Sequence, residues 1–331
     1  MSLEKEMLAL QKLYGAQSVG YAKDLVSSKG SYSTGSLQLN AYLGGGFPIG
    51  RIVEIKGPYS SGKSSMAIHA LADCQKQGHK AMFVDLEGTF DKVYAHNLGV
   101  NIQDLIYIPP MNGEDAMGMA EKLCKTGEIG LIVVDSIAAL LPGKIGEDEY
   151  GKANMAFHAK LVGEMTKRFV PVLSTNNVAM IAINQLRKKP GVSFGNPEYS
   201  TGGESVGFYA SVILDIRKSG AVEKDKDGIT ISEPRKIKIE KCKINNSVSR
   251  TMMVDIIYGE GLDKYGEIVE AGLEVGVLQK KGSWYSHNDV MIGQGKVQVK
   301  QFLKDNPEAL EELEGVIWDK FFIPLSADID I

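Results

Sequence analysis

The sequence is poor in the residues that mark several specialised classes of protein. Three cysteines occur among 331 residues, at Cys74, Cys124 and Cys242, and they form neither a C-x-x-C pair nor a cluster with histidine. This spacing supports neither a disulfide framework nor a zinc site, so we expect a reducing, cytoplasmic location. Proline is scarce, at 11 residues, and 44% of the chain is apolar. Such a composition excludes a disordered or collagen-like chain.

Long apolar runs are missing as well. No segment reaches the roughly 18 apolar residues of a membrane span, and charged residues interrupt the apolar positions of the first fifteen residues. We therefore expect neither a membrane helix nor a signal peptide. The formal net charge is -4, from 37 Lys plus Arg against 41 Asp plus Glu. Because the chain is not basic as a whole, any nucleic-acid binding must come from local patches.

Short apolar strands alternate with helical segments from residue 51 to residue 185. This alternation predicts an α/β fold with a mostly parallel, doubly wound sheet. Three further strand-like runs, between residues 210 and 258, are expected to extend the sheet as antiparallel strands. We divide the chain into an N-terminal helix and linker (1–32), a core (33–262) and a small helix-rich α/β domain (263–331). The apolar spacing of residues 3–27 predicts the N-terminal helix.

A complete G-x-x-x-x-G-K-[ST] motif follows an apolar strand and opens a helix. Its residues are Gly57, Pro58, Tyr59, Ser60, Ser61, Gly62, Lys63 and Ser64. The glycines let backbone N–H groups point at phosphate oxygens, and the helix N-terminus adds a favourable dipole. Lys63 would neutralise the β- and γ-phosphates, and the Ser64 hydroxyl would ligate Mg²⁺. The motif therefore predicts a site for ATP and Mg²⁺.

Three other strand ends supply polar groups for this site. Asp135 follows the apolar run 131–134 and is the expected second-sphere partner of Mg²⁺. Many P-loop ATPases carry the hydrolytic glutamate at the next position, but Ser136 stands there. We assign the general base to Glu87, at the end of a neighbouring strand, over the alternative of a solvated carboxylate. Gln185 ends a third strand, where it could sense the γ-phosphate or simply cap the strand.

Basic residues gather in three places outside the phosphate motif. The loop of residues 186–203 is long, rich in glycine and basic, which suits either a phosphodiester backbone or a flexible surface loop. A second basic stretch contains Lys160 and Lys167, and by itself it reads as a solvated helix face. Lys241 and Lys243 share one face of an alternating strand. They either line a wet strand face or meet phosphates of a neighbouring subunit.

Several motifs resemble, in order, those of the bacterial RecA recombinases. These motifs are STGSLQLN, GRIVEIKGPYSSGKSS, LIVVDSIAAL, FGNPEYSTGG, FYASVILDIRK, YGEG and WYSHNDVMIGQGK followed by FLKDNPE. The resemblance extends from about Ser33 to Phe322. It implies a RecA-type P-loop ATPase core and an ATP-dependent recombinase, a DNA-dependent ATPase that forms helical filaments on single-stranded DNA. Such an enzyme pairs that strand with homologous duplex DNA and exchanges strands.

The resemblance also implies roles for individual residues. Glu87 matches the family's catalytic glutamate, and Gln185 matches the glutamine that couples the γ-phosphate to the DNA loop. Lys241 and Lys243 match lysines that reach ATP across a subunit interface, and Phe208 matches an interface aromatic. Further nucleotide contacts are expected at Ser65, Asp91, Tyr94 and Tyr258. DNA contacts are expected at Met155, Lys160, Lys167, Arg187, Lys188, Lys189, Phe194, Gly202 and Gly203.

Two other functions share the phosphate motif. A ring helicase would use the same ATP site but would translocate along a strand. A non-catalytic scaffold gated by ATP would need Glu87 to be idle. The N-terminal helix with its linker, the STGSLQLN segment and the predicted interface lysines favour the recombinase filament over both.

Overall fold

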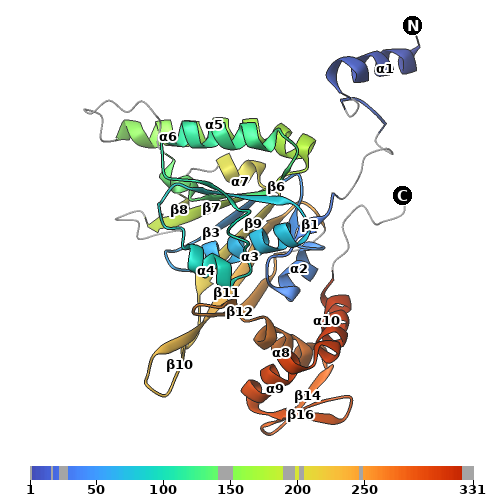
Figure 1. The fold of residues 1–331 in the computed structure, drawn as a ribbon, viewed down its shortest axis with the longest axis vertical. Helices are drawn as coiled ribbons and strands as arrows, with labels where there is room; N and C mark the ends of the chain where they lie inside the picture. Colours follow the sequence, from blue (N-terminus) through green and yellow to red (C-terminus); the bar gives the residue numbers. More distant parts are fainter. Residues whose placement is uncertain are drawn as a thin grey trace.

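The computed structural model describes residues 2–15, 18–21, 29–140, 152–188, 198–200, 205–245 and 249–322. A central sheet carries helices on both faces, and a smaller lobe follows towards the C-terminus (Figure 1). The helices are α1 (Leu3–Tyr14), α2 (Leu37–Leu43), α3 (Lys63–Lys76), α4 (Lys92–Asn97), α5 (Gly113–Cys124), α6 (Lys152–Asn176), α7 (Ser205–Tyr209), α8 (Lys264–Val275), α9 (Gly295–Asp305) and α10 (Pro307–Phe321). The strands are β1 (Ser31–Tyr32), β2 (Phe47–Pro48), β3 (Ile52–Gly57), β4 (Lys80–Asp85), β5 (Ile106–Ile108), β6 (Ile129–Asp135), β7 (Ala179–Lys188), β8 (Glu198–Ser200), β9 (Val212–Lys218), β10 (Glu223–Lys224), β11 (Thr230–Cys242), β12 (Thr251–Ile257), β13 (Gly261–Leu262), β14 (Leu278–Lys281), β15 (Trp284–His287) and β16 (Val290–Gln294).

The strands of the main sheet lie in the order β13-β12-β11-β9-β3-β7-β6-β4-β5, with β10 beside β11 and β8 beside β7. The six strands from β9 to β5 in this order run parallel to one another, which confirms the predicted parallel core. β11, β12 and β13 are antiparallel to their neighbours. Our expectation of three antiparallel strands is confirmed for β11 and β12, and it holds for one side of β9, which is antiparallel to β11 but parallel to β3. Since α7 lies between β8 and β9, the chain can re-enter the sheet in the direction of β3.

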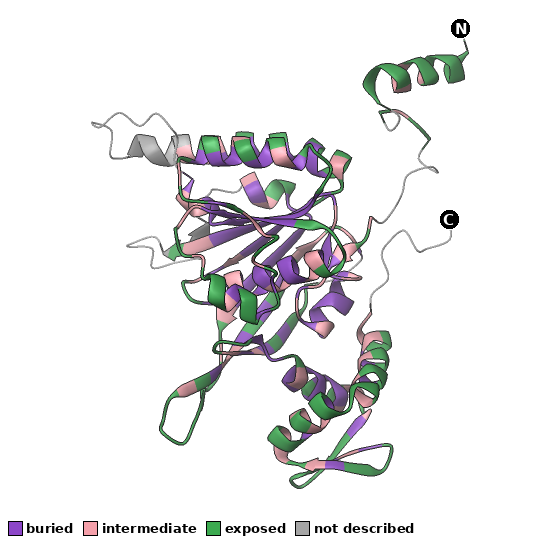
Figure 2. Cartoon of the chain, in the orientation of Figure 1, coloured by how far each residue is buried: buried purple, intermediate pink, exposed green. Residues whose placement is uncertain are grey.

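Alternate residues of the buried strands feed two separate hydrophobic cores. On β3, Ile52 packs into the core that contains Phe169 of α6. Its neighbours Val53 and Ile55 pack into the opposite core, with Leu71 of α3. Figure 2 shows the buried strands between the two helical layers. This two-sided burial explains why the sequence runs are nearly continuously apolar, and it confirms the doubly wound arrangement.

The N-terminal helix is shorter than the apolar spacing of residues 3–27 indicated. α1 ends at Tyr14, and the next residue, Gly15, has φ +104°. No residue of α1 is buried, and the helix stands apart from the main body in Figure 1. Leu3, Leu8 and Leu13 are exposed by 68%, 56% and 72%. The apolar periodicity therefore does not serve packing within this subunit.

The C-terminal domain has a hydrophobic core of its own. Leu303, Leu313 and Ile317 from α9 and α10 are fully buried in it. β14, β15 and β16 form a separate antiparallel sheet beside these helices, so the helix-rich pattern understated the strand content. Among the described residues, no helix combines the length and the apolar character needed to cross a membrane.

A buried carboxylate joins this domain to the core. Oε1 of Glu267, on α8, accepts hydrogen bonds from the Ser36 hydroxyl (2.6 Å) and from the Gln38 N–H (2.8 Å) at the start of α2. Its second oxygen, Oε2, is buried without a hydrogen-bond partner. Burial raises the pKa of Glu267 to about 7, with a smaller contribution from Asp263 in the same direction. The protonated form is therefore favoured in the folded protein.

We expect Glu267→Gln to remove a pH dependence of stability. Between the ordinary pKa of 4.5 and about 7, the folded protein retains a proton that the unfolded chain has released. The free energy of unfolding therefore falls as pH rises through this window, by up to about 1.4 kcal/mol per pH unit, relative to the glutamine variant. Urea unfolding of both proteins across the window measures the difference. Parallel pH profiles would contradict a proton on Glu267.

Candidate active site

The phosphate motif forms a tight turn between β3 and α3. A Cβ atom on Gly57 would lie 2.2 Å from the Ile216 carbonyl oxygen, and one on Gly62 would lie 2.2 Å from Cδ1 of Ile256. Gly62 also has φ +96° and sits at the N-terminus of α3. Gly57 is therefore required by its close approach to the backbone of β9, and Gly62 by its backbone conformation. The chain folds here in the manner that the motif predicted.

Lys63 lies buried across this turn, with 7% exposure. Its ammonium group donates to the carbonyl oxygens of Gly57 (3.2 Å) and Pro58 (2.7 Å). Burial lowers the pKa of Lys63, while nearby Asp135 and Glu87 oppose that shift. The Ser61 hydroxyl is buried in the same turn and has no hydrogen-bond partner. A buried ammonium and a buried hydroxyl at a helix N-terminus fit the oxygens of a polyphosphate.

Asp135 ends β6 beside the first turn of α3. Its Oδ2 accepts a hydrogen bond of 2.7 Å from the Ser64 hydroxyl. Burial raises the pKa of Asp135 to about 6, with further upward contributions from Glu87 and Asp85. A hydroxyl and a carboxylate are oxygen ligands of the kind that Mg²⁺ takes together with phosphates and waters. Within the described residues no group of three or more His, Cys, Asp or Glu could hold a metal ion.

Glu87 lies on the loop that follows β4. Its Oε1 accepts hydrogen bonds from the Ser136 hydroxyl and from Nε2 of Gln185, the latter at 2.5 Å. The register explains the meeting, because Gly57 pairs with Gln185 and Asp85 pairs with Asp135. The structure therefore brings together the four features that the sequence assigned to one phosphate site, namely the phosphate motif, Asp135, Glu87 and Gln185. It adds Ser136, which the sequence analysis treated only as a missing glutamate.

The further nucleotide contacts expected from the resemblance lie in two places. Asp91 caps α4, where its Oδ1 accepts from the N–H groups of Val93 (2.8 Å) and Tyr94 (3.0 Å). The Tyr94 hydroxyl donates to Ser65 on α3 at 2.8 Å, which ties α4 to the phosphate helix. Tyr258, at the end of β12, is exposed and donates to Glu233 at 3.0 Å. Asp91 and Tyr94 thus adjoin the phosphate motif, and Tyr258 is held on the β11–β12 side.

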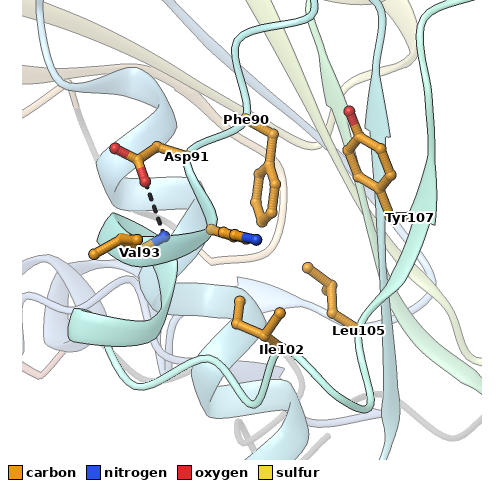
Figure 3. Close-up of a pocket in the computed structure, with 7 residues that line it drawn as sticks. Phe90, Asp91, Val93, Ile102, Leu105 and Tyr107 are labelled. Carbon is orange, nitrogen blue, oxygen red and sulfur yellow. Dashed lines mark hydrogen bonds between the residues drawn. The ribbon is translucent and has the colours of Figure 1, made fainter.

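A cavity of about 630 Å³ opens beside Asp91. Figure 3 shows the side chains of Phe90 and Val93 on one side and those of Ile102, Leu105 and Tyr107 on the other. Phe90 also packs against the rings of Phe83 and Tyr107, with centroids 4.6 Å and 5.5 Å away. The loop that carries Glu87 therefore ends at the rim of a largely apolar cavity.

The two predicted interface lysines meet α7 rather than the phosphate motif. Lys241 donates to the carbonyl oxygens of Gly207 and Phe208, the latter at 3.3 Å, and Lys243 donates to that of Phe208 at 3.4 Å. Burial and the charge of Lys243 lower the pKa of Lys241. The Phe208 ring is 69% exposed. The three residues form one exposed surface, which we call the lysine–Phe208 surface.

The expected DNA contacts are only partly described. Met155, Lys160 and Lys167 lie on α6; both lysines are exposed, and Lys160 pairs with Glu164 at 3.8 Å. Arg187 is exposed near the end of β7 and lies opposite Tyr199 of β8. The remaining predicted contact within β7 is Lys188. Lys189, Phe194, Gly202 and Gly203 lie outside the described residues.

An arginine that the sequence analysis missed secures the base of this loop. Arg217 on β9 forms a bond of 2.6 Å to Glu198 on β8 and one of 2.8 Å to Asp215. These two carboxylates raise the pKa of Arg217 above its ordinary value. Arg217 lies in the FYASVILDIRK motif, which was used only to identify the family resemblance. Nothing in the local sequence pattern indicated that Glu198 would be its partner. The contact fixes β8, and so one end of the loop, to the sheet.

Two family models match consecutive parts of the chain. Residues 1–263 match the model of the RecA N-terminal domain, and residues 266–321 match that of the RecA C-terminal domain. This chain belongs to the RecA family. It is 42% identical over 320 residues to Protein RecA of Rhodospirillum rubrum, covering 96% of this chain and 86% of that protein. It is 43% identical over 321 residues to Protein RecA of Bacteroides thetaiotaomicron, covering 96% of each. Over 291 residues it is 44% identical to Protein RecA of Rickettsia bellii, covering 88% of this chain and 84% of that protein.

Membership of the RecA family confirms the resemblance drawn from the motifs. RecA proteins are DNA-dependent ATPases that form filaments and exchange DNA strands, and this chain is an ATP-dependent recombinase of that kind. The ring-helicase and scaffold alternatives are thereby set aside. The family does not by itself assign roles to individual residues, which rest on the contacts described above.

We expect Glu87→Gln to lower ATP hydrolysis at least ~100-fold while leaving ATP binding intact, because the amide keeps the shape but cannot accept a proton. Phosphate release and binding of a fluorescent ATP analogue measure the two properties. Glu114→Gln, an exposed change in the first turn of α5, is the matched control. Unchanged turnover would remove Glu87 from the chemistry. Joint loss of binding and turnover would mean that its contacts with Ser136 and Gln185 are structural.

Proposed function

We propose that ATP is hydrolysed at the carboxyl ends of β3, β4 and β6. Four side chains have separate roles there, namely Lys63, Ser64, Asp135 and Glu87. Lys63 binds the β- and γ-phosphates, and the Ser64–Asp135 pair holds Mg²⁺, which would polarise the phosphate oxygens. Glu87 accepts the proton of the attacking water. The main support for this proposal is the hydrogen bond between Gln185 and Glu87. It joins the proposed base to the strand that leads into the basic loop.

Gln185 is the proposed sensor of the γ-phosphate. Its amide donates to Glu87 in the structure, so a phosphate oxygen near Glu87 would compete for the same N–H. Two residues later the chain reaches Arg187, at the start of the loop proposed to bind DNA. A change of hydrogen-bond partner at Gln185 can thus alter the position of the loop. This change would give tighter DNA binding with ATP than with ADP.

The lysine–Phe208 surface is the proposed contact with ATP of a neighbouring subunit. In the described residues, the hydrogen bonds of Lys241 and Lys243 go to α7 and not to the phosphate motif. The ammonium groups are therefore aimed at a different surface from the one that Lys63 occupies. Stacking subunits so that this surface covers the ATP of the next one produces a filament, which fits the 69% exposure of Phe208.

We further propose the substrates and the setting of this filament. Its primary partner is single-stranded DNA, bound along α6 and the loop after β7, and its second partner is a homologous duplex. A cytoplasmic location is supported by the scarce cysteines. The proposed division into residues 1–32, 33–262 and 263–331 is supported by the exposed α1 and by the separate core of the C-terminal domain.

A mixing experiment tests both the ATPase and the shared site. We expect Lys241→Ala to bind nucleotide but to lose hydrolysis stimulated by single-stranded DNA, and Lys63→Ala to lose turnover at its own site. Mixed, the second protein offers an intact Lys241 to the ATP of the first, so part of the stimulated hydrolysis returns. Lys122→Ala, an exposed change on α5, should resemble the unmodified protein. No recovery at any ratio would place the lysines within their own subunit.

The DNA contacts predict a defined salt dependence. If Lys160, Lys167 and groups of the loop neutralise about three phosphates per subunit, the log of the affinity for single strands should fall with the log of salt at a slope of about −2. Lys160→Ala should make the slope shallower by about 0.7. Fluorescence anisotropy of a labelled strand, with ATP and with ADP, measures this. An unchanged slope together with equal affinity in both nucleotides would exclude α6 from the DNA site.

A further inference from the structure

Tyr107 on β5 reaches a buried carboxylate on the neighbouring strand. Its hydroxyl donates to Oδ2 of Asp85 at 2.9 Å. The register accounts for this contact. Tyr107 pairs with Phe83 of β4. Asp85 lies two residues further along β4 and therefore on the same face of that strand. Asp85 is fully buried, whereas Tyr107 is 43% exposed. The tyrosine therefore reaches in from the edge of the sheet.

The same carboxylate holds the loop that carries Glu87. Oδ1 of Asp85 accepts from the N–H groups of Gly88 (2.7 Å) and Thr89 (3.2 Å), and Oδ2 accepts from that of Phe90 (3.0 Å). Hydrogen bonds to an ionised carboxylate are shorter and stronger than neutral ones. One side chain thus fixes three consecutive peptide groups directly after Glu87. The Tyr107 hydroxyl is the side-chain donor that orients this acceptor.

Packing restrains this loop at its ends, where Leu86 and Phe90 lie against different hydrophobic cores. The Phe90 ring stacks towards Phe83 and Tyr107, but it also borders the cavity of about 630 Å³ (Figure 3). Interiors are normally close-packed and resist displacement of their side chains. A loop that borders a cavity lacks part of this restraint. The hydrogen bonds to Asp85 therefore contribute more to keeping the loop in its position.

We propose that Tyr107 is a positioning residue for ATP hydrolysis, acting through Asp85 on the loop that carries Glu87. The inference rests on the proposed role of Glu87 as general base. On one side, Ser136 and Gln185 hold the Glu87 carboxylate. On the other, the Tyr107–Asp85 pair holds the backbone from which that carboxylate projects. Nucleotide affinity depends less on the pair, since Asp91 is anchored separately by the N–H groups at the start of α4.

The test is Tyr107→Phe, which keeps the ring beside Phe90 and removes only the hydroxyl. We expect kcat for DNA-stimulated hydrolysis to fall roughly tenfold, because small displacements of a catalytic group are costly, while ATP affinity changes less than about twofold. Tyr32→Phe is the matched control, because it removes a buried tyrosine hydroxyl that bonds to His79 at 3.0 Å, away from the site. A merely structural role would lower the unfolding temperature of both variants and leave both kcat values unchanged.

A double-mutant cycle with Asp85→Asn checks the route of the effect. If Tyr107 acts through Asp85, the loss of kcat in the double variant should be smaller than the product of the two single losses. Independent, multiplicative losses, or an unchanged kcat in Tyr107→Phe, would overturn the inference. Glu87→Gln separates the two levels of the argument. If it abolishes turnover while Tyr107→Phe is fully active, only the positioning role fails; if it retains turnover, the proposed role of Glu87 fails first.

Discussion

The parallel register of β3, β7, β6 and β4 is the constraint on which the site depends. Gly57 lies beside Gln185, and Asp85 lies beside Asp135, so all four strands end at one edge. Neighbouring strands are about 4.8 Å apart, which leaves their terminal side chains no choice but to share a small volume. One displaced strand would separate Glu87 from Gln185 and Asp135 from the phosphate helix. The two hydrophobic cores stabilise this register by burying both faces of the strands.

Charged side chains buried in this shared volume carry a desolvation cost. Burial lowers the pKa of Lys63 and raises that of Asp135 to about 6, so desolvation disfavours the charge on each. Lys63 meanwhile bonds to backbone carbonyl oxygens, which carry only partial charges. A polyphosphate with a divalent cation brings both signs of charge into the same space. In the proposed site it would offer full anions to Lys63 and a cation to Asp135, so that binding would offset this desolvation cost.

The sequence predicted the parts of the site that depend on local patterns. The phosphate turn follows from its spaced glycines, and the end of β6 follows from the apolar run that stops at Asp135. The expectation that the next strand ends at Gln185 was wrong, because β7 continues to Lys188 and pairs there with β8. The sequence did not predict the partners that depend on tertiary placement. The parallel direction of β9 comes from a crossover, and Tyr107 meets Asp85 only through the pairing of β4 with β5. α1 ends early because Gly15 adopts a left-handed conformation, which apolar periodicity does not encode.

Strand order also decides how the proposed functions can communicate. Along β11-β9-β3-β7 lie, in turn, the interface lysines, Arg217, the phosphate turn and Gln185. Lys56 of β3 bonds to Glu240 of β11 at 2.6 Å across the intervening β9, and Arg217 of β9 bonds to β8 beside the DNA loop. These side-chain bonds connect β3 to β11 and β9 to β8, strands that are already fixed in register. Because such a sheet resists deformation, exchange of partners at Gln185 is more readily relieved in the segment after β7, where part of the proposed DNA site lies.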